Sequence, residues 1–230
     1  LCLSRFCKCD TLIIPLKNQV NLPEHLEKFP VLPILNHASP DEALVVAEAL
    51  LTGGVKIMEI TLRTDLATDA LIQVRREFPE LFLGVGSITS EEQLDWAVNE
   101  GINFGVSPAW SDSLWERSLE IKLPFIPGIL TPTELLKASY AGCYHLKIFP
   151  IEPVGGIPYL NSLIAPFRGS KIKYLPTGGI SKDVVSQYLQ IPEVMTVGGS
   201  WLTPKKLVLK KDRSAITKLA KSSLLLANTT

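Results

Sequence analysis

The chain has 230 residues, and its 23 Lys and Arg residues balance its 23 Asp and Glu residues. A zero net charge argues against a nucleic-acid-binding protein, because such proteins usually carry a strong basic excess. Hydrophobic residues make up 46% and charged residues 20% of the chain, and no apolar run reaches 18 residues. These values exclude a disordered chain and a membrane-spanning helix, and they allow one domain with a large core.

The N-terminal segment contains most of the cysteines of the chain. Four cysteines are too few for a disulfide scaffold. Three of them lie in the first ten residues without the spacing of a zinc site, and Cys143 stands alone. We therefore expect unpaired thiols, a reducing compartment and no bound metal. Residues 1–30 are interpreted as an N-terminal extension, and residues 31–230 as the folded domain.

From residue 31 onward, short apolar runs alternate with longer amphipathic stretches. The runs predict eight strands, at 31–35, 56–62, 82–86, 103–106, 123–126, 145–149, 172–175 and 194–197. The stretches between and after them predict helices at 40–51, 65–78, 90–101, 111–119, 131–140, 156–165, 181–189 and 213–226. Ser90, with Gln93 three residues later, is typical of a capping box at a helix start.

The alternation predicts an α/β fold. Strands that alternate with helices form parallel sheets, because parallel neighbours need crossover connections. Eight such units predict a single (β/α)8 TIM barrel, preceded by the short N-terminal extension. An open doubly wound sheet is the alternative, but its usual GxGxxG signature is absent after the first strand, where the chain reads NHAS at 36–39.

Two charged residues lie inside apolar strands, Glu59 in the second and Lys147 in the sixth. Burial lowers the pKa of a lysine, and a neutral amine in a dry pocket can form a Schiff base with a carbonyl substrate. A carboxylate in an apolar surrounding suits proton transfer. The alternatives are a packed lysine stem whose head reaches water and, for Glu59, an ion pair with Lys147 or Arg63.

Two glycine pairs follow the last two strands, in Thr177-Gly178-Gly179 and Gly198-Gly199-Ser200. Barrel enzymes often bind phosphate at these two loops, through free backbone N–H groups. Glycine pairs also mark ordinary turns. Arg63 follows the second strand, and its planar guanidinium can hold a carboxylate or a phosphate unless it is only a solvated loop residue.

Seven stretches of the chain together resemble the class I 2-keto-3-deoxy-6-phosphogluconate (KDPG) aldolases, also described as 4-hydroxy-2-oxoglutarate (KHG) aldolases. The resemblance runs in order through residues 31–226. The stretches are EITLRT at 59–64, GVGSIT at 84–89, SP at 107–108, IPGI at 126–129, LKIFP at 146–150, PTGGIS at 176–181 and GGSWL at 198–202. LKIFP, PTGGIS and GGSWL are specific as a group, although none is specific alone.

The resemblance implies roles for particular residues. Lys147 would be the Schiff-base lysine and Glu59 the general acid and base. The implied substrate-binding residues are Arg63, Ser87, Thr61, Pro108, Phe149 and Thr177, and the implied phosphate-binding residues are Gly178, Gly179, Gly199 and Ser200. The chain departs from the family in Ser87, where threonine is common, and in Ala109, where glycine is frequent.

The implied reaction is cleavage of KDPG to pyruvate and glyceraldehyde 3-phosphate, in sugar-acid catabolism of the Entner-Doudoroff type. The same imine chemistry would cleave KHG to pyruvate and glyoxylate. The resemblance also implies a cytoplasmic homotrimer that needs no metal or cofactor and whose partner is a small phosphorylated keto acid, not a nucleic acid or a membrane. A non-catalytic barrel that binds a phosphorylated sugar acid and an imine-free phosphate-barrel isomerase are the alternatives.

Overall fold

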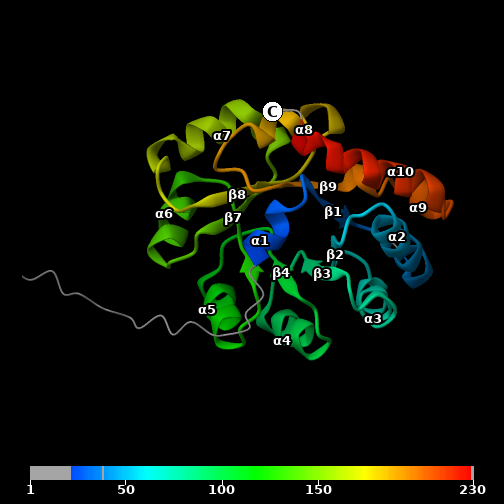
Figure 1. The fold of residues 1–230 in the computed structure, drawn as a ribbon. Coiled ribbons are helices and arrows are strands. Elements are labelled where there is room, and N and C mark those ends of the chain that lie inside the picture. The colour runs from blue at the N-terminus through cyan, green and yellow to red at the C-terminus, as the bar shows by residue number, and fades with distance from the viewer. Residues whose placement is uncertain (1–21, 38, 229–230) are drawn as a thin grey trace, which may run out of the picture.

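The computed structural model describes residues 22–37 and 39–228, and its strands form a curled parallel sheet surrounded by helices (Figure 1). The strands are β1 (Val31–Leu35), β2 (Ile57–Thr61), β3 (Phe82–Gly86), β4 (Phe104–Val106), β5 (Phe125–Ile126), β6 (Gly128–Ile129), β7 (His145–Ile148), β8 (Lys173–Pro176) and β9 (Val197–Gly199). They pair in the orders β5-β4-β3-β2-β1-β9 and β6-β7-β8, and every pair is parallel.

The two groups of strands join into a ring. β5 and β6 are two halves of one strand, separated by Pro127, which has no N–H to donate to a neighbouring strand. The Pro127 carbonyl still accepts a bond from the Lys147 N–H at 3.0 Å. On the other side, β8 and β9 meet through bridges between Tyr174 and Val194 and between Thr177 and Gly198. The ring confirms the predicted TIM-barrel fold, and the open-sheet alternative is wrong.

The helices pack on the outside of the ring, apart from α1 (Figure 1). They are α1 (Leu22–Glu27), α2 (Pro40–Thr52), α3 (Ala67–Glu77), α4 (Glu91–Asn99), α5 (Asp112–Glu120), α6 (Pro132–Tyr140), α7 (Gly156–Ile164), α8 (Val185–Leu189), α9 (Lys205–Leu209) and α10 (Arg213–Leu224). Short 3-10 turns are η1 (Glu152–Val154), η2 (Ala165–Phe167), η3 (Lys182–Val184), η4 (Ser200–Leu202) and η5 (Leu225–Asn228). None of the helices in the described residues is long and apolar enough to cross a membrane.

The ends of several helices follow from their sequence. Ser39 and Thr131 cap α2 and α6, and each forms a capping box with a glutamate three residues later. The backbone N–H of Ser90 donates to Gln93 Oε1 at 3.3 Å, as the predicted capping box requires. These caps satisfy backbone donors that the first turn of a helix otherwise leaves free.

Three predicted elements differ in detail from the observed ones. The predicted strand at 123–126 begins later, as β5, and continues beyond Pro127 as β6. The predicted strand at 194–197 is displaced to β9, because regular pairing with β1 starts only where Val31 meets Val197. Before that point, Val194 makes only a single bridge to β8. The predicted helix at 181–189 begins as η3 and becomes α-helical only in α8.

Helix α1 covers the amino ends of the strands. Leu22 and Leu26 are buried in the main hydrophobic core, and the His25 ring stacks on Phe82 at a centroid distance of 4.4 Å. Phe82 is the first residue of β3, so α1 lies at the end of the barrel where strands begin. Figure 1 shows α1 across the middle of the ring. Because α1 covers the amino end of the barrel, a binding site is expected at the other end, where the strands have their carboxyl ends.

Candidate active site

Lys147 and Glu59 face each other inside the barrel. Lys147 is the third residue of β7 and Glu59 the third residue of β2. The distance from Lys147 Nζ to Glu59 Oε1 is 3.8 Å, and their side chains are 5% and 1% exposed. Neither carboxylate oxygen of Glu59 has a hydrogen-bond partner among the described residues. The pair therefore keeps its polar atoms free for a molecule bound beside it.

The surroundings of Lys147 favour its neutral form. Burial is the main cause and lowers the pKa of the amine, the Glu59 carboxylate opposes this effect, and the Arg63 guanidinium adds to it. The Phe149 ring lies beside the amine, with its centroid 5.2 Å from Nζ. A lysine with a lowered pKa loses its proton at a lower pH than an ordinary lysine. A larger fraction of it is therefore neutral and nucleophilic near pH 7.

Arg63 stands at the rim beside this pair. Its Nε donates a hydrogen bond to Ser87 Oγ at 3.0 Å, which orients the guanidinium, and its Cζ lies 6.0 Å from the centroid of the Phe149 ring. Its two Nη groups have no other partner in the described part of the chain. Thr61, two residues before Arg63, donates to the Asn36 carbonyl oxygen at 3.4 Å. A carboxylate beside Lys147 would find a planar, oriented partner in Arg63.

These side chains line one cavity of about 250 Å³, which we call the central cavity. Its lining residues are Ile34, Asn36, Glu59, Thr61, Arg63, Lys147, Phe149, Thr177, Gly178, Gly179, Ile180, Gly198 and Ser200. The residues predicted from the sequence that lie in this set are Glu59, Thr61, Arg63, Lys147, Phe149, Thr177, Gly178, Gly179 and Ser200. The barrel thus gathers residues from five strands and the loops that follow them.

Three predicted residues lie outside this lining. Ser87 is connected to it through its bond to Arg63. Gly199 pairs with Pro33 of β1, and the Pro108 backbone packs against Gly128, where a Cβ atom would meet the Pro108 carbonyl carbon at 2.4 Å.

Other lining residues were not assigned from the sequence: Ile34, Asn36, Ile180 and Gly198. Asn36 directly follows β1, so the rule that chemistry lies where strands end would have included it. Its side chain carries no charge, and a single asparagine after a strand gives little signal in the sequence.

Two glycines make room for the site. A Cβ atom on Gly86 would lie 1.8 Å from Glu59 Oε1, so the carboxylate occupies the space that any side chain there would fill. Gly178 has a φ of +102°, in the region that side-chain-bearing residues rarely adopt, and its Cβ would lie 3.1 Å from the Phe149 ring. Both positions therefore need glycine for the observed geometry.

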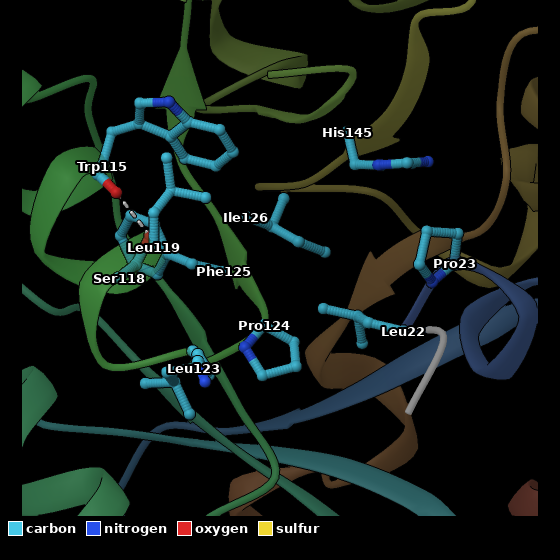
Figure 2. A pocket seen from close by; sticks show the side chains of 11 residues that line it. Leu22, Pro23, Trp115, Ser118, Leu119, Leu123, Pro124, Phe125, Ile126 and His145 are labelled. Carbon is cyan, nitrogen blue, oxygen red and sulfur yellow. Dashed lines mark hydrogen bonds between the residues drawn. The ribbon is translucent and has the colours of Figure 1, made fainter. Parts of the chain in front are cut away.

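Another pocket, of about 430 Å³, lies at the opposite end of the barrel, between α1, α5 and the starts of β5 and β7. Figure 2 shows its mainly apolar lining, with Leu22, Phe125 and Ile126 around the space that His145 borders. His145 and Lys147 are two residues apart on β7, but at different ends of the strand. The pocket is larger than the central cavity, yet it contains no paired nucleophile and acid, so it is not the candidate active site.

The central cavity supplies three chemical elements of an imine-forming site. They are an amine whose neutral form is favoured, a carboxylate within proton-transfer reach through one water, and a cation for an anionic substrate group. Among the described residues, no group of three or more His, Cys, Asp or Glu side chains is placed to hold a metal ion.

A sequence profile of the family described as KDPG and KHG aldolase matches residues 22–219. The chain belongs to this family. It is 36% identical over 195 residues to the KHG/KDPG aldolase of Escherichia coli strain K12, covering 85% of this chain and 91% of that protein. It is equally similar, with the same coverage, to the 2-dehydro-3-deoxy-phosphogluconate aldolase of Dickeya dadantii. The resemblance found in the sequence is confirmed.

Solved structures agree with this assignment. The fold matches the KDPG aldolase of Legionella pneumophila with a TM-score of 0.85 and 32% identity, over 90% of this chain and 99% of that one. That enzyme holds pyruvate as a covalent carbinolamine intermediate. The Zymomonas mobilis ZM4 aldolase, solved with 3-phosphoglycerate, matches with a TM-score of 0.84 and 32% identity, over 91% and 97% of the two chains. A carbinolamine is the step before a Schiff base, so the family relation supports class I aldolase chemistry.

Proposed function

We propose that this chain is a class I aldolase that cleaves KDPG to pyruvate and glyceraldehyde 3-phosphate. The observation that carries the proposal is the buried pair of Lys147 and Glu59, 3.8 Å apart in a cavity at the carboxyl ends of the strands. An isolated ion pair would not need a cavity, and an isomerase would not need an amine with a lowered pKa.

The first half of the reaction builds an electron sink. The neutral Nζ of Lys147 attacks the C2 carbonyl of the substrate to give a carbinolamine. Its hydroxyl takes the proton that Lys147 and Glu59 hold between them and leaves as water, so that a protonated imine remains. Glu59, directly or through one water, takes the proton of the C4 hydroxyl. The C3–C4 bond then breaks, its electron pair moves to the imine, and the C4 hydroxyl becomes the aldehyde of glyceraldehyde 3-phosphate.

The second half restores the enzyme. The pyruvate enamine that remains on Lys147 takes a proton at C3, which Glu59 can return because it holds the one removed from the C4 hydroxyl. Water then adds to the imine carbon, Glu59 takes the proton that this hydrolysis releases, and pyruvate and the free amine are formed. One carboxylate thus serves as base and then as acid, and the proton transfers of the whole cycle balance without an external acid, base or metal.

Neighbouring groups hold the two ends of the substrate. Arg63, oriented by Ser87, binds the C1 carboxylate with help from Thr61 and the loop at Pro108, while Phe149 and Thr177 pack beside the imine. Backbone N–H groups of Gly178, Gly179 and Gly199, together with the Ser200 hydroxyl, bind the phosphate. These contacts are remote from the breaking bond, so their binding energy positions the reacting carbons.

KHG is a second candidate substrate, because its cleavage to pyruvate and glyoxylate uses the same imine. It has no phosphate, so it leaves the glycine loops without a ligand. We therefore expect the chain to prefer KDPG, with a higher kcat/KM for the phosphorylated acid.

A coupled assay tests the proposed reaction. Purified protein is incubated with KDPG, and pyruvate and glyceraldehyde 3-phosphate are each measured with their own NAD-linked dehydrogenase. We expect both products in equal amounts, and a loss of at least about 1,000-fold in kcat for Lys147→Met and Glu59→Gln in folded protein. A protein that binds KDPG without cleaving it would be the non-catalytic barrel, and one that converts it without releasing pyruvate would be the isomerase.

We also propose that residues 31–230 form the catalytic barrel, with α1 packed against its amino end, and that the protein is a cytoplasmic homotrimer that needs no cofactor. The support is the family relation and the expectation of reduced thiols from the cysteine pattern. Light scattering should give about three times the chain mass of 25.3 kDa. A mass of one or two chains would contradict the trimer, and a fluorescent fusion outside the cytoplasm would contradict the location.

A further inference from the structure

A second cavity adjoins the central cavity on its phosphate-loop side. It has a volume of about 430 Å³, and we call it the outer cavity. Both cavities are lined by Asn36, Gly179, Ile180 and Ser200, so the two spaces meet at the glycine loops. The outer cavity then extends past Ser181 and η4 to Lys205, the first residue of α9.

The lining of the outer cavity carries a positive charge and no negative one. Its lining residues are Leu35, Asn36, His37, Gly179, Ile180, Ser181, Ser200, Trp201, Thr203, Pro204, Lys205 and Val208. The lining contains no carboxylate, and Lys205 is its one lysine or arginine. The phosphate loops themselves offer only neutral donors, namely backbone N–H groups and hydroxyls. Lys205 is thus the one lysine or arginine in this lining that can supply a positive charge to an anion bound at the junction of the two cavities.

Lys205 is exposed. Like its neighbour Lys206, it forms no ion pair with any of the described residues, so its ammonium group is available to a ligand. It also occupies the first turn of its helix, where the helix dipole disfavours a positive side chain. Lys205 differs from Lys206 in that its side chain lines the outer cavity, which adjoins the glycine loops.

We propose that Lys205 determines specificity for the phosphorylated substrate by pairing with its phosphate at the junction of the two cavities. The inference rests on the proposed function, in which the C1 carboxylate lies at Arg63 and the imine forms at Lys147. The phosphate is attached at C6, four carbons beyond the imine carbon, so it points away from Arg63 towards the glycine loops and the outer cavity. Arg63 and Lys205 then hold opposite ends of a substrate that is anionic at both ends.

A binding experiment that does not need catalysis tests this role. Isothermal titration calorimetry with 3-phosphoglycerate is compared for the wild type, Lys205→Gln and the matched control Lys206→Gln. Lys206 is the exposed neighbour on the same helix and does not line either cavity. We expect Lys205→Gln to raise the Kd roughly three- to tenfold, as for a partly exposed charge-assisted bond, and Lys206→Gln to leave it unchanged. Lys205→Arg should restore tight binding, and glycerate, which has no phosphate, should bind all four proteins alike.

Steady-state kinetics separates this role from a structural one. Lys205→Gln should raise the KM for KDPG by a similar factor with kcat within about twofold of wild type, because the contact is made in both ground and transition states. Equal Kd values for the wild type and Lys205→Gln would overturn the inference, as would an equal loss in Lys206→Gln or with glycerate. If the wild type fails to cleave KDPG but the calorimetric difference remains, the proposed reaction fails and the anion contact stands.

Discussion

Replacing Gly86 by alanine should disable the site without touching a catalytic residue. Gly86 ends β3 and pairs with Thr61 on β2, two residues beyond Glu59 and on the same face of the strand. A Cβ atom there would lie 1.8 Å from Glu59 Oε1, 2.5 Å from Cδ and 2.8 Å from Cγ. Since φ at Gly86 is not in the left-handed region, alanine fits the backbone, and the strain falls on the carboxylate.

The size of the effect follows from the overlap. Non-bonded atoms settle at about 3.5 Å, so the Glu59 carboxylate has to move by roughly 1.5–2 Å. A displacement of about 1 Å in a catalytic group can cost about 100-fold in rate, so kcat should fall by at least about 100-fold. The overpacking itself should cost only about 1–3 kcal/mol of stability, which leaves the protein folded.

The assay measures pyruvate release from KDPG together with thermal unfolding by circular dichroism. Gly105→Ala is the matched control. Gly105 lies on β4, and its Cβ would be 2.7 Å from Ile88 Cδ1, with Glu59 absent from its near neighbours. It should lose stability to a similar degree and retain most of its kcat. A folded Gly86→Ala protein with wild-type kcat, or equal losses of kcat in both variants, would refute the view that the exact place of the Glu59 carboxylate limits cleavage.

The remaining predictions concern pH and stability. Because burial lowers the pKa of Lys147, the rate of imine formation with pyruvate should rise with pH through an apparent pKa below the roughly 10.4 of an ordinary lysine and then level off. Arg63→Met removes a positive neighbour that lowers this pKa, so the rise should move to higher pH, and an unmoved or lower profile would contradict the assignment. Leu26→Ala, which empties a buried position of α1, should lower the free energy of unfolding by about 2–5 kcal/mol in urea titrations. Leu136→Ala at a 44% exposed position should change it by less than about 0.5 kcal/mol, and equal effects would show that α1 is not part of the barrel.

The barrel could be predicted well from the sequence because its signals are local. Each strand is a short apolar run, and buried parallel strands such as β2 and β3 keep nearly every residue out of solvent. Glu59 and Lys147 interrupt such runs, so the sequence alone marks them as charged residues in apolar surroundings. Their separation of 3.8 Å could not be predicted in this way, because β2 and β7 are on different parts of the ring and no local pattern fixes that distance.

Other features were missed because they depend on packing. Helix α1 was assigned to the N-terminal extension, since six residues with only two buried leucines give too weak a periodicity to predict a helix. The five-residue α9 was missed for the same reason, and with it the place of Lys205 beside the glycine loops. The sequence shows Gly86 only as part of the GVGSIT stretch, whereas the need for glycine there comes from the Glu59 side chain of the neighbouring strand.

Trapping the imine tests the central claim most directly. The protein is incubated with pyruvate and sodium borohydride, and the product is examined by intact and peptide mass spectrometry, with Lys147→Met as the control. We predict one stable adduct per chain, located on Lys147 and absent from the variant. An adduct on another lysine, or a folded wild-type protein without any adduct under conditions in which it cleaves KDPG, would contradict the Schiff-base mechanism.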